Sequence, residues 1–286
     1  MCSIFQKNID EIGKGCDFLI ATPGQLIHFI KEGIVYIDTI SYLVLDECDE
    51  LLKTSPNPNT DSLSKQVERI WNWANRNAQM ICVSATMGEF TAAFCQTLVK
   101  PENFFYLTTP VAAPNKRVQL IFQLCTNKTK RLKVMEYLAA KFEGCQNPFQ
   151  QQAFLFAKDC GVVADLSLAL DESDIPTAPL HGNVGQDVRE KSLNLFRRRQ
   201  IAVLSVSDVG SRGMDITNVE TVVNYEMPQQ INLFIHRVGR CGRNKPGTAV
   251  TFVTASDKEI LVELRKVIED AGHEIPPTLD ELLCSL

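Results

Sequence analysis

Two adjacent carboxylates follow an apolar segment in the first third of the chain. Asp46 and Glu47 come directly after Leu43–Leu45, a segment that is typical of a short strand. At the carboxyl end of a parallel strand, where open α/β folds bind ligands, one such acid can hold Mg²⁺ through its waters. The other can orient or deprotonate an attacking water. A strand that merely ends in a solvated acidic turn is the simpler alternative for this pair alone.

Two further short motifs lie at predicted strand ends. Ser84-Ala85-Thr86 follows an apolar segment, Met80–Val83, and its hydroxyl groups could hydrogen-bond across a cleft. A turn or a helix cap is the more common explanation of such a triplet. Thr22-Pro23-Gly24 breaks one segment and begins a helix, and a helix N-terminus suits a phosphodiester backbone. An ordinary strand-to-helix turn explains it equally well.

Arginines and glycines alternate in the second half of the chain. Gln186 and Arg189 are three residues apart and share a helix face. Arg240 and Arg243 are flanked by glycines, which permit close approach of a ligand to the backbone. Arginine offers a permanent charge and planar, bidentate donors. The three arginines of the segment 236–243 therefore favour phosphate binding: Arg237, Arg240 and Arg243. The run Arg197–Arg199 is instead typical of a solvated surface.

The composition indicates a folded protein without a membrane span. The chain has 286 residues, of which 45% are hydrophobic and 22% charged, as in soluble domains. No apolar run reaches the length of a membrane helix, and the first residues show no secretory signal. The ten cysteines form no C-x-x-C pair, which argues against zinc. We therefore expect reduced thiols and a cytoplasmic or nuclear location.

The charge distribution gives no sign of a basic domain or tail. The formal net charge is −5. Residues 1–117 carry 10 basic and 13 acidic side chains, and residues 118–286 carry 19 and 21. The segment 182–243, by contrast, holds nine basic and six acidic side chains. Any site for a polyanion must therefore be local.

Short apolar segments alternate with helical patterns along both halves of the chain. This alternation predicts an α/β fold with parallel sheets that helices cover. In the first part the predicted strands are 17–21, 42–45 and 80–83, and the predicted helices are 25–31 and 64–75. In the second part the predicted strands are 153–157, 201–206, 221–225 and 249–253, and the helices are 162–170, 186–199, 231–237 and 257–271. We place a first domain at 1–110, a linker at 111–117 and a second domain at 118–286.

Six motifs occur in order between positions 22 and 243. They are Thr-Pro-Gly, Asp-Glu-Cys-Asp, Ser-Ala-Thr, His-Gly-x-x-x-Gln-x-x-Arg, Ser-Arg-Gly-Met-Asp and His-Arg-Val-Gly-Arg-Cys-Gly-Arg. The combination resembles the DEAD-box family of ATP-dependent RNA helicases over almost the whole chain. Residues 15–24 and 215–219 look most like its Vasa-like branch. The resemblance implies two RecA-like α/β domains with parallel sheets, the first of them incomplete.

The resemblance also implies ATP and Mg²⁺ as cofactors and assigns residues to them. Asp46 would hold Mg²⁺ through water, and Glu47 would activate the attacking water. Arg240 and Arg243 would reach the γ-phosphate from the second domain, one of them as an arginine finger. Asp215 would contact the ribose of ATP.

The implied partner is RNA, which the family holds by its backbone without reading its sequence. The residues implied to bind RNA are Thr22, Pro23, Gly24, Gln186, Arg189, Ser207 and Arg212. Those implied to couple hydrolysis to strand separation are Ser84, Thr86 and His236. The resemblance further implies a monomer that does not associate with membranes.

Several positions depart from the family pattern. Gln25 stands where the family usually has Arg, so one RNA-phosphate contact is in question. Cys48, Ser207 and Cys241 are milder replacements of the usual Ala, Thr and Thr. The phosphate loop Gly-x-x-x-x-Gly-Lys-[Ser/Thr] does not occur in the sequence, and Gly13-Lys14-Gly15 does not match it. We therefore expect a first domain without its phosphate cradle, and a strand before Asp46 with one unpaired edge.

Three hypotheses follow from this pattern. The first is an RNA helicase whose chain is a fragment, a short isoform or an incomplete gene model. The second is a catalytically inactive, helicase-like module that binds RNA or a protein through its second domain. The third is a remnant whose first 110 residues have no stable fold. The sequence upstream of Met1 would distinguish the first hypothesis from the other two.

Overall fold

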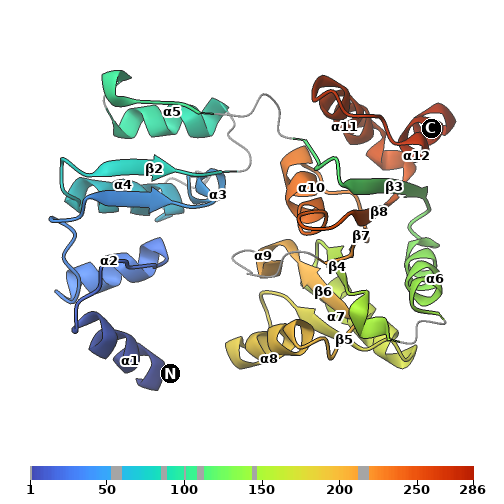
Figure 1. Ribbon diagram of the computed structural model, residues 1–286, viewed down its shortest axis with the longest axis horizontal. Coiled ribbons are helices and arrows are strands. Elements are labelled where there is room, and N and C mark those ends of the chain that lie inside the picture. The colour runs from blue at the N-terminus through green and yellow to red at the C-terminus, as the bar shows by residue number, and fades with distance from the viewer. Residues whose placement is uncertain are drawn as a thin grey trace. The chain divides into compact units, whose positions relative to one another are not determined.

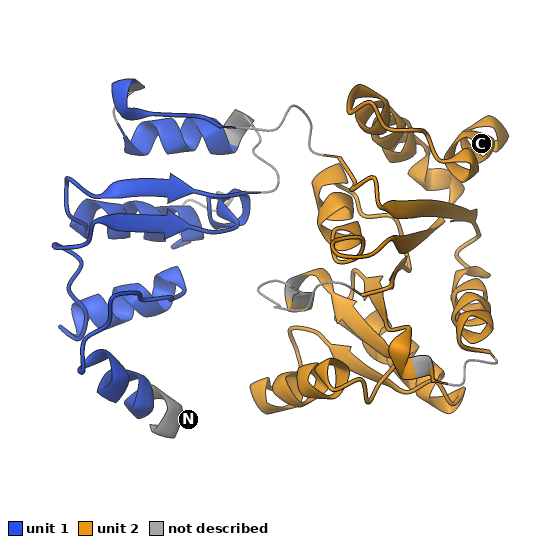
Figure 2. Cartoon of the chain, viewed as in Figure 1, with its two compact units in different colours: residues 1–108 blue, residues 109–286 orange. Residues whose placement is uncertain are grey.

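The chain forms two compact units. The computed structural model describes residues 2–52, 60–84, 89–99, 101–107, 113–143, 147–211 and 219–286. Unit 1 spans residues 1–108 and unit 2 spans residues 109–286 (Figure 2). Both contain a parallel sheet with helices, which confirms the predicted α/β class. Among the described residues, no helix combines the length and apolar composition of a membrane span.

Unit 1 contains a two-stranded parallel sheet, in which β1 (Tyr42–Leu45) pairs with β2 (Gln79–Cys82). Its helices are α1 (Cys2–Ile12), α2 (Pro23–Lys31), α3 (Cys48–Leu51), α4 (Leu63–Trp73) and α5 (Glu89–Leu98) (Figure 1). Apolar side chains of α2 and α4 pack together with the 35–37 segment. Among the described residues, β2 is the only strand that pairs with β1, so the other edge of β1 is unpaired there.

The prediction of a strand over Asp17–Ala21 is wrong. The structure gives this segment no regular secondary structure. Phe18 and Ile20 are 91% and 97% exposed, respectively. An extended segment becomes a strand only when a neighbouring strand satisfies its backbone groups, and the described part of unit 1 supplies none here. The apolar composition of this segment therefore predicts a strand, but no neighbouring strand in the described part of unit 1 pairs with it.

Unit 2 contains a six-stranded parallel sheet with the order β3-β8-β7-β4-β6-β5. Its strands are β3 (Val118–Leu124), β4 (Ala153–Ala157), β5 (Thr177–Leu180), β6 (Val203–Ser207), β7 (Thr221–Asn224) and β8 (Gly247–Val253). The three central strands, β4, β6 and β7, are buried at every position. Continuous burial is expected for a parallel sheet that is covered on both faces.

Helices cover this sheet on both faces, so the core consists of two halves that the sheet separates. They are α6 (Lys130–Phe142), α7 (Cys160–Glu172), α8 (Gln186–Arg197), α9 (Asp208–Ser211), α10 (Ile231–Val238), α11 (Lys258–Asp270) and α12 (Pro277–Ser285) (Figure 1). Phe154 and Phe156 of β4 belong to the half that contains residues of α8, α10, α11 and α12. Leu155, between them, belongs to the half with α6 and α7, as the alternation of side chains along a strand requires.

Candidate functional site

The acidic pair of unit 1 lies at the carboxyl end of β1, in a strained turn. Glu47 has φ 50° and ψ 46°, the left-handed conformation that residues other than glycine rarely adopt. The Glu47 N–H donates to Asp46 Oδ1 at 3.0 Å, which supports this turn. Asp46 is exposed and Glu47 half-buried. Both carboxylates thus lie at the carboxyl end of β1, as the sequence predicted. This is the edge of a parallel sheet at which open α/β folds bind ligands.

Backbone hydrogen bonds connect the acidic turn to the start of the Ser-Ala-Thr motif. The Val83 N–H donates to Leu45 O at 2.9 Å, and the Cys48 N–H donates to Val83 O at 3.0 Å. Ser84 follows directly and is half-buried. Thr86 lies outside the described residues. The structure therefore brings the acidic pair and the first residue of the second motif to one edge of the sheet.

The acidic turn suits a loosely held Mg²⁺ ion. No group of three His, Cys, Asp or Glu side chains that could hold a metal occurs in the described ranges. Mg²⁺ keeps several of its waters and is usually bound by only one or two carboxylates plus substrate phosphates. The exposed carboxylate of Asp46 fits such water-mediated binding, and it does not form a closed metal cage by itself.

The Thr-Pro-Gly motif forms the N-terminus of α2. Thr22 is the N-cap residue, Pro23 is at the first helical position, and the Thr22 side chain makes no capping hydrogen bond. Thr22 and Gly24 are exposed. Gln25, which stands in place of the expected arginine, is half-buried, and its Nε2 atom has no hydrogen-bond partner. The motif is thus an open helix start that faces solvent.

In unit 2 the ends of β5 and β6 approach each other at Gly210. A Cβ atom at this position would lie 2.4 Å from Leu180 O and 3.0 Å from His181 Cα, so only glycine permits this contact between α9 and the end of β5. Arg189 of α8 donates from Nη2 to Gly210 O at 3.5 Å. The Gly210 N–H in turn donates to Ser207 Oγ at 3.1 Å. Two motifs that are separated in sequence therefore meet at this edge.

The predicted RNA contacts of unit 2 differ in how exposed they are. Gln186 is exposed and donates to Glu190 Oε1 at 3.1 Å, while Arg189 is half-buried. Ser207 is only 2% exposed, so its hydroxyl holds the Gly210 turn from inside. Arg212 and Asp215 lie outside the described residues. Burial lowers the pKa of the nearby His181 imidazole.

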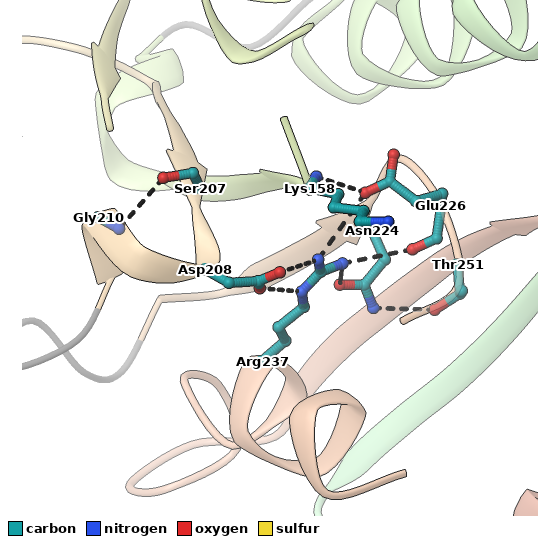
Figure 3. A network of polar contacts seen from close by, with 8 residues as sticks. All are labelled: Lys158, Ser207, Asp208, Gly210, Asn224, Glu226, Arg237 and Thr251. Carbon is teal, nitrogen blue, oxygen red and sulfur yellow. Dashed lines mark hydrogen bonds and ion pairs between the residues drawn. The ribbon is translucent and has the colours of Figure 1, made fainter. Parts of the chain in front are cut away.

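A buried ion-pair network centred on Arg237 lies at the carboxyl ends of the central strands (Figure 3). Arg237, from α10, is 2% exposed and contacts Asp208 through two parallel bonds, Nε to Oδ1 at 2.6 Å and Nη2 to Oδ2 at 2.8 Å. Its Nη1 donates to Asn224 Oδ1 at 3.4 Å and to Glu226 O at 3.3 Å. Its guanidinium also lies over the Phe156 ring. The network joins α10 to the strand ends that form the edge.

The carboxylate of Glu226 completes the network from the end of β7. Its Oε1 accepts a hydrogen bond from the Lys158 N–H at 2.7 Å and lies 3.8 Å from Arg237 Nη2. Burial raises the pKa of Glu226, and the Arg237 charge opposes that rise. The sequence favoured phosphate binding by all three arginines of this motif, but Arg237 is instead buried and paired with Asp208 inside the protein. No local spacing could reveal this pairing, since Asp208 is 29 residues away.

The other two arginines of the last motif follow α10 and are more accessible. Arg240 is half-buried, and Arg243 is exposed, with Nε donating to Gly239 O at 3.1 Å. Gly242, between them, has φ +74°, and a Cβ there would lie 2.4 Å from Val118 Cγ2. This glycine lets the segment turn against β3, which leaves Arg243 in solvent. His236, on α10, is half-buried.

Segments of both units match known protein families. Residues 3–94 match the family described as DEAD/DEAH box helicase, and residues 126–245 match the helicase conserved C-terminal domain. The chain is 28% identical over 280 residues to the probable ATP-dependent RNA helicase ddx3 of Dictyostelium discoideum, covering 97% of this chain and 38% of that protein. It is 29% identical over 283 residues to ATP-dependent RNA helicase DDX4 of Mus musculus, covering 98% and 39%.

Solved structures show the same fold. One is S. cerevisiae Dbp5 bound to RNA and ADP BeF3, with a TM-score of 0.74, 23% identity and coverage of 93% of this chain and 67% of that one. Another is Mss116p bound to ssRNA and AMP-PNP, with a TM-score of 0.77, 22% identity and coverage of 95% and 54%. The chain spans 33% to 54% of the length of the curated relatives that we compared. The two matched domains, in this order along the chain, place it in the DEAD-box RNA helicase family.

Proposed function

We propose that this chain carries the RNA-contacting and phosphate-contacting parts of an ATP-dependent RNA helicase, which couples ATP hydrolysis to local unwinding of RNA duplexes. The observation that supports this best is the strand-end edge of unit 2. There Arg189 touches the Gly210 turn, and α10, which is anchored by Arg237, leads into Arg240 and Arg243. This edge bears cationic side chains although the protein as a whole is acidic.

The proposed roles follow the family motifs residue by residue. Asp46 would hold Mg²⁺ through its waters, and Glu47 would accept the proton of the attacking water. Arg240 and Arg243 contact the phosphates of ATP, and Asp215 contacts its ribose. RNA phosphates are held by Thr22–Gly24, Gln186, Arg189 and Arg212. Ser84, Thr86 and His236 couple the nucleotide to RNA, while Ser207 acts through the Gly210 turn that it supports.

Bound ATP and Mg²⁺ would supply the phosphoryl group and neutralise its charge, while the side chains position it. We place the protein in the Vasa-like branch, with Asp-Glu-Cys-Asp as its form of the name-giving tetrapeptide. The phosphate-loop pattern does not occur among the 286 residues. For these residues by themselves, this observation favours a second candidate function, a helicase-like module that binds RNA or a protein without hydrolysing ATP.

ATP turnover distinguishes the two candidates. We expect residues 1–286 alone to show no substantial RNA-stimulated ATPase, because positioning and charge neutralisation make up most of phosphoryl-transfer catalysis. Arg240 and Arg243 cannot replace a phosphate cradle. The measurement is steady-state phosphate release with and without single-stranded RNA. Turnover comparable to that of a full-length relative, and abolished by Glu47→Gln, would show that the chain is an active ATPase by itself.

Weak, largely electrostatic RNA binding is the second expected result. We expect about two to four phosphate contacts, and therefore a log–log salt slope of magnitude about 1.5–3 for a single strand. Arg189→Ala is expected to weaken binding about tenfold and equally for all sequences, since a phosphate contact carries no base information. Arg243→Ala is expected to change RNA affinity little, because its proposed partner is the nucleotide. Fluorescence anisotropy with two unrelated strands across a salt series measures all three effects.

Two further variants serve as controls for the RNA measurement. Arg198→Ala removes the same charge from an exposed position at the end of α8 and should leave affinity nearly unchanged. Arg189→Lys keeps the charge and should retain most of the binding. A larger loss from Arg243→Ala than from Arg189→Ala would reverse the two assignments. Strong preference for one strand would contradict recognition of the RNA backbone.

A further inference from the structure

Three cysteines from three separate elements belong to one cluster next to the acidic turn. Cys48 is the first residue of α3 and follows Glu47 in sequence. Cys82 is the last residue of β2, two positions before Ser84. Cys95 lies in α5. The fold thus gathers three thiols beside both motifs that unit 1 contributes at this edge.

Two of the three sulfur atoms are in contact, and all three cysteines share one apolar cluster. Cys95 Sγ lies 3.6 Å from Cys82 Sγ and donates a hydrogen bond to it. Cys48 and Cys95 are buried and Cys82 is half-buried. The side chains around them include Leu45, Leu52, Val67, Met80, Phe94 and Phe104. Apolar side chains therefore surround the two buried cysteines, and a small oxidant can reach the cluster at the half-buried Cys82.

Hydrogen bonding within the cluster distinguishes the three thiols electronically. Hydrogen bonding among the three cysteines lowers the pKa of Cys95 and raises that of Cys82. Reactivity toward oxidants follows thiolate character and access. Thiolate character favours Cys95 and access favours Cys82, and the 3.6 Å between their sulfurs lets either one resolve the other.

We propose that Cys82 and Cys95 form a reversible disulfide when the protein meets hydrogen peroxide. The thiolate of one cysteine of the pair attacks one oxygen of the peroxide, the O–O bond breaks, and sulfenic acid forms with release of water after proton transfer. The sulfur of the other cysteine then attacks the sulfur of the sulfenic acid, and its proton leaves with the hydroxyl group as a second water. Peroxide is reduced and two thiols are oxidised. The two sulfurs must approach by about 1.5 Å to reach bonding distance.

The bond would fasten α5 to the end of β2, directly before Ser84 and beside the turn that holds Glu47. It would also change the packing around Cys48, which belongs to the same cluster and follows Glu47. Oxidation would therefore act on the backbone that carries both motifs of unit 1. A dithiol reductant reverses the change by exchange. This inference concerns a modification site, and it stands whether or not the chain hydrolyses ATP.

Peptide mapping of the peroxide-treated protein tests this site with a built-in distinction between partners. Trypsin does not cleave Lys100-Pro101, so Cys82 and Cys95 fall in one peptide, 77–116, whereas Cys48 falls in the separate peptide 32–53. We expect 77–116 to lose two hydrogen atoms and to become resistant to alkylation. Dithiothreitol should restore both thiols. Two alkylatable thiols in 77–116 after treatment, or its cross-linking to 32–53, would overturn the proposal.

Substitutions separate the proposed pair from the neighbouring thiol and from general thiol oxidation. Cys48→Ser should still form the bond, and Cys82→Ser should not. In Cys82→Ser, Cys95 should accumulate as sulfenic acid, which dimedone traps. Cys125 is a buried cysteine of unit 2 whose thiol donates to Val253 O, and Cys125→Ser is the matched control that should oxidise like the parent. Equal loss of the thiol of Cys125 and those of the pair would show unselective oxidation and reject the site.

Discussion

Asp208→Ala is expected to lower the unfolding free energy of unit 2 by about 3–5 kcal/mol, since it leaves a buried guanidinium without its main partner. Arg237 is 2% exposed and holds Asp208 through two short bonds. Glu226, at 3.8 Å, remains as a longer and weaker partner. For a unit of this size the loss corresponds to a Tm shift of about 10 °C. Thermal unfolding followed by circular dichroism, with the full chain, measures it.

An exposed ion pair in the same unit offers a matched control. Arg265 pairs with Asp280 at 2.9 Å, with side chains that are 39% and 48% exposed, so Asp280→Ala should shift the Tm far less. The double variant Asp208→Ala/Arg237→Met should be more stable than Asp208→Ala alone, because it removes the buried guanidinium that has lost its main partner. Glu226, which then loses its cation, can take up a proton, since burial already raises its pKa. If the double variant is no better, the loss comes from α9 itself and not from the stranded arginine.

Limited proteolysis is expected to remove unit 1 first and to leave a resistant fragment that begins near residue 113. Unit 2 has six paired strands with helices on both faces. The described part of unit 1 has two paired strands and exposes large apolar side chains such as Phe18, Ile20 and Val44, and small sheets of this kind are marginal alone. Thermolysin digestion with mass spectrometry of the surviving fragment gives the answer.

Expression of the two units separately provides the comparison for this experiment. Residues 113–286 should unfold cooperatively with a Tm near that of the main transition of the full chain. Residues 1–108 should show a broader transition and cleavage at many sites. Equal protease resistance on the two sides of Pro114 would contradict the expected difference between the units.

The sequence predicted the central strands of unit 2 well, because buried parallel strands are continuous apolar runs. Ala153–Ala157 is identical to β4, and β6 and β7 differ from their predicted ranges only at the ends. The predicted strands did not include β3 and β5, the two outer strands of the sheet. β5 contains Pro179, a residue that argues against a strand except at an edge.

The site was predictable where neighbours in sequence form it and unpredictable where the fold does. The acidic pair follows β1 as expected because strand and turn are contiguous. The contact of Arg189 with Gly210, and of Arg237 with Asp208, joins residues that are 21 and 29 positions apart. Nothing in the spacing of these residues specifies such contacts. They depend on the strand order β7-β4-β6-β5, which places the ends of distant strands side by side.

At position 47 the residue that best suits the left-handed backbone differs from the residue that best suits the proposed chemistry. A side chain in this conformation carries a penalty of about 1–2 kcal/mol, which glycine avoids. Substitutions that stabilise a turn of this kind therefore remove the carboxylate that we assign to proton transfer. A laboratory selection for thermostability alone would move this position toward glycine, whereas a selection for turnover in a complete enzyme would retain the acid. Stabilised variants of the protein should accordingly be designed around residue 47, with that residue left unchanged.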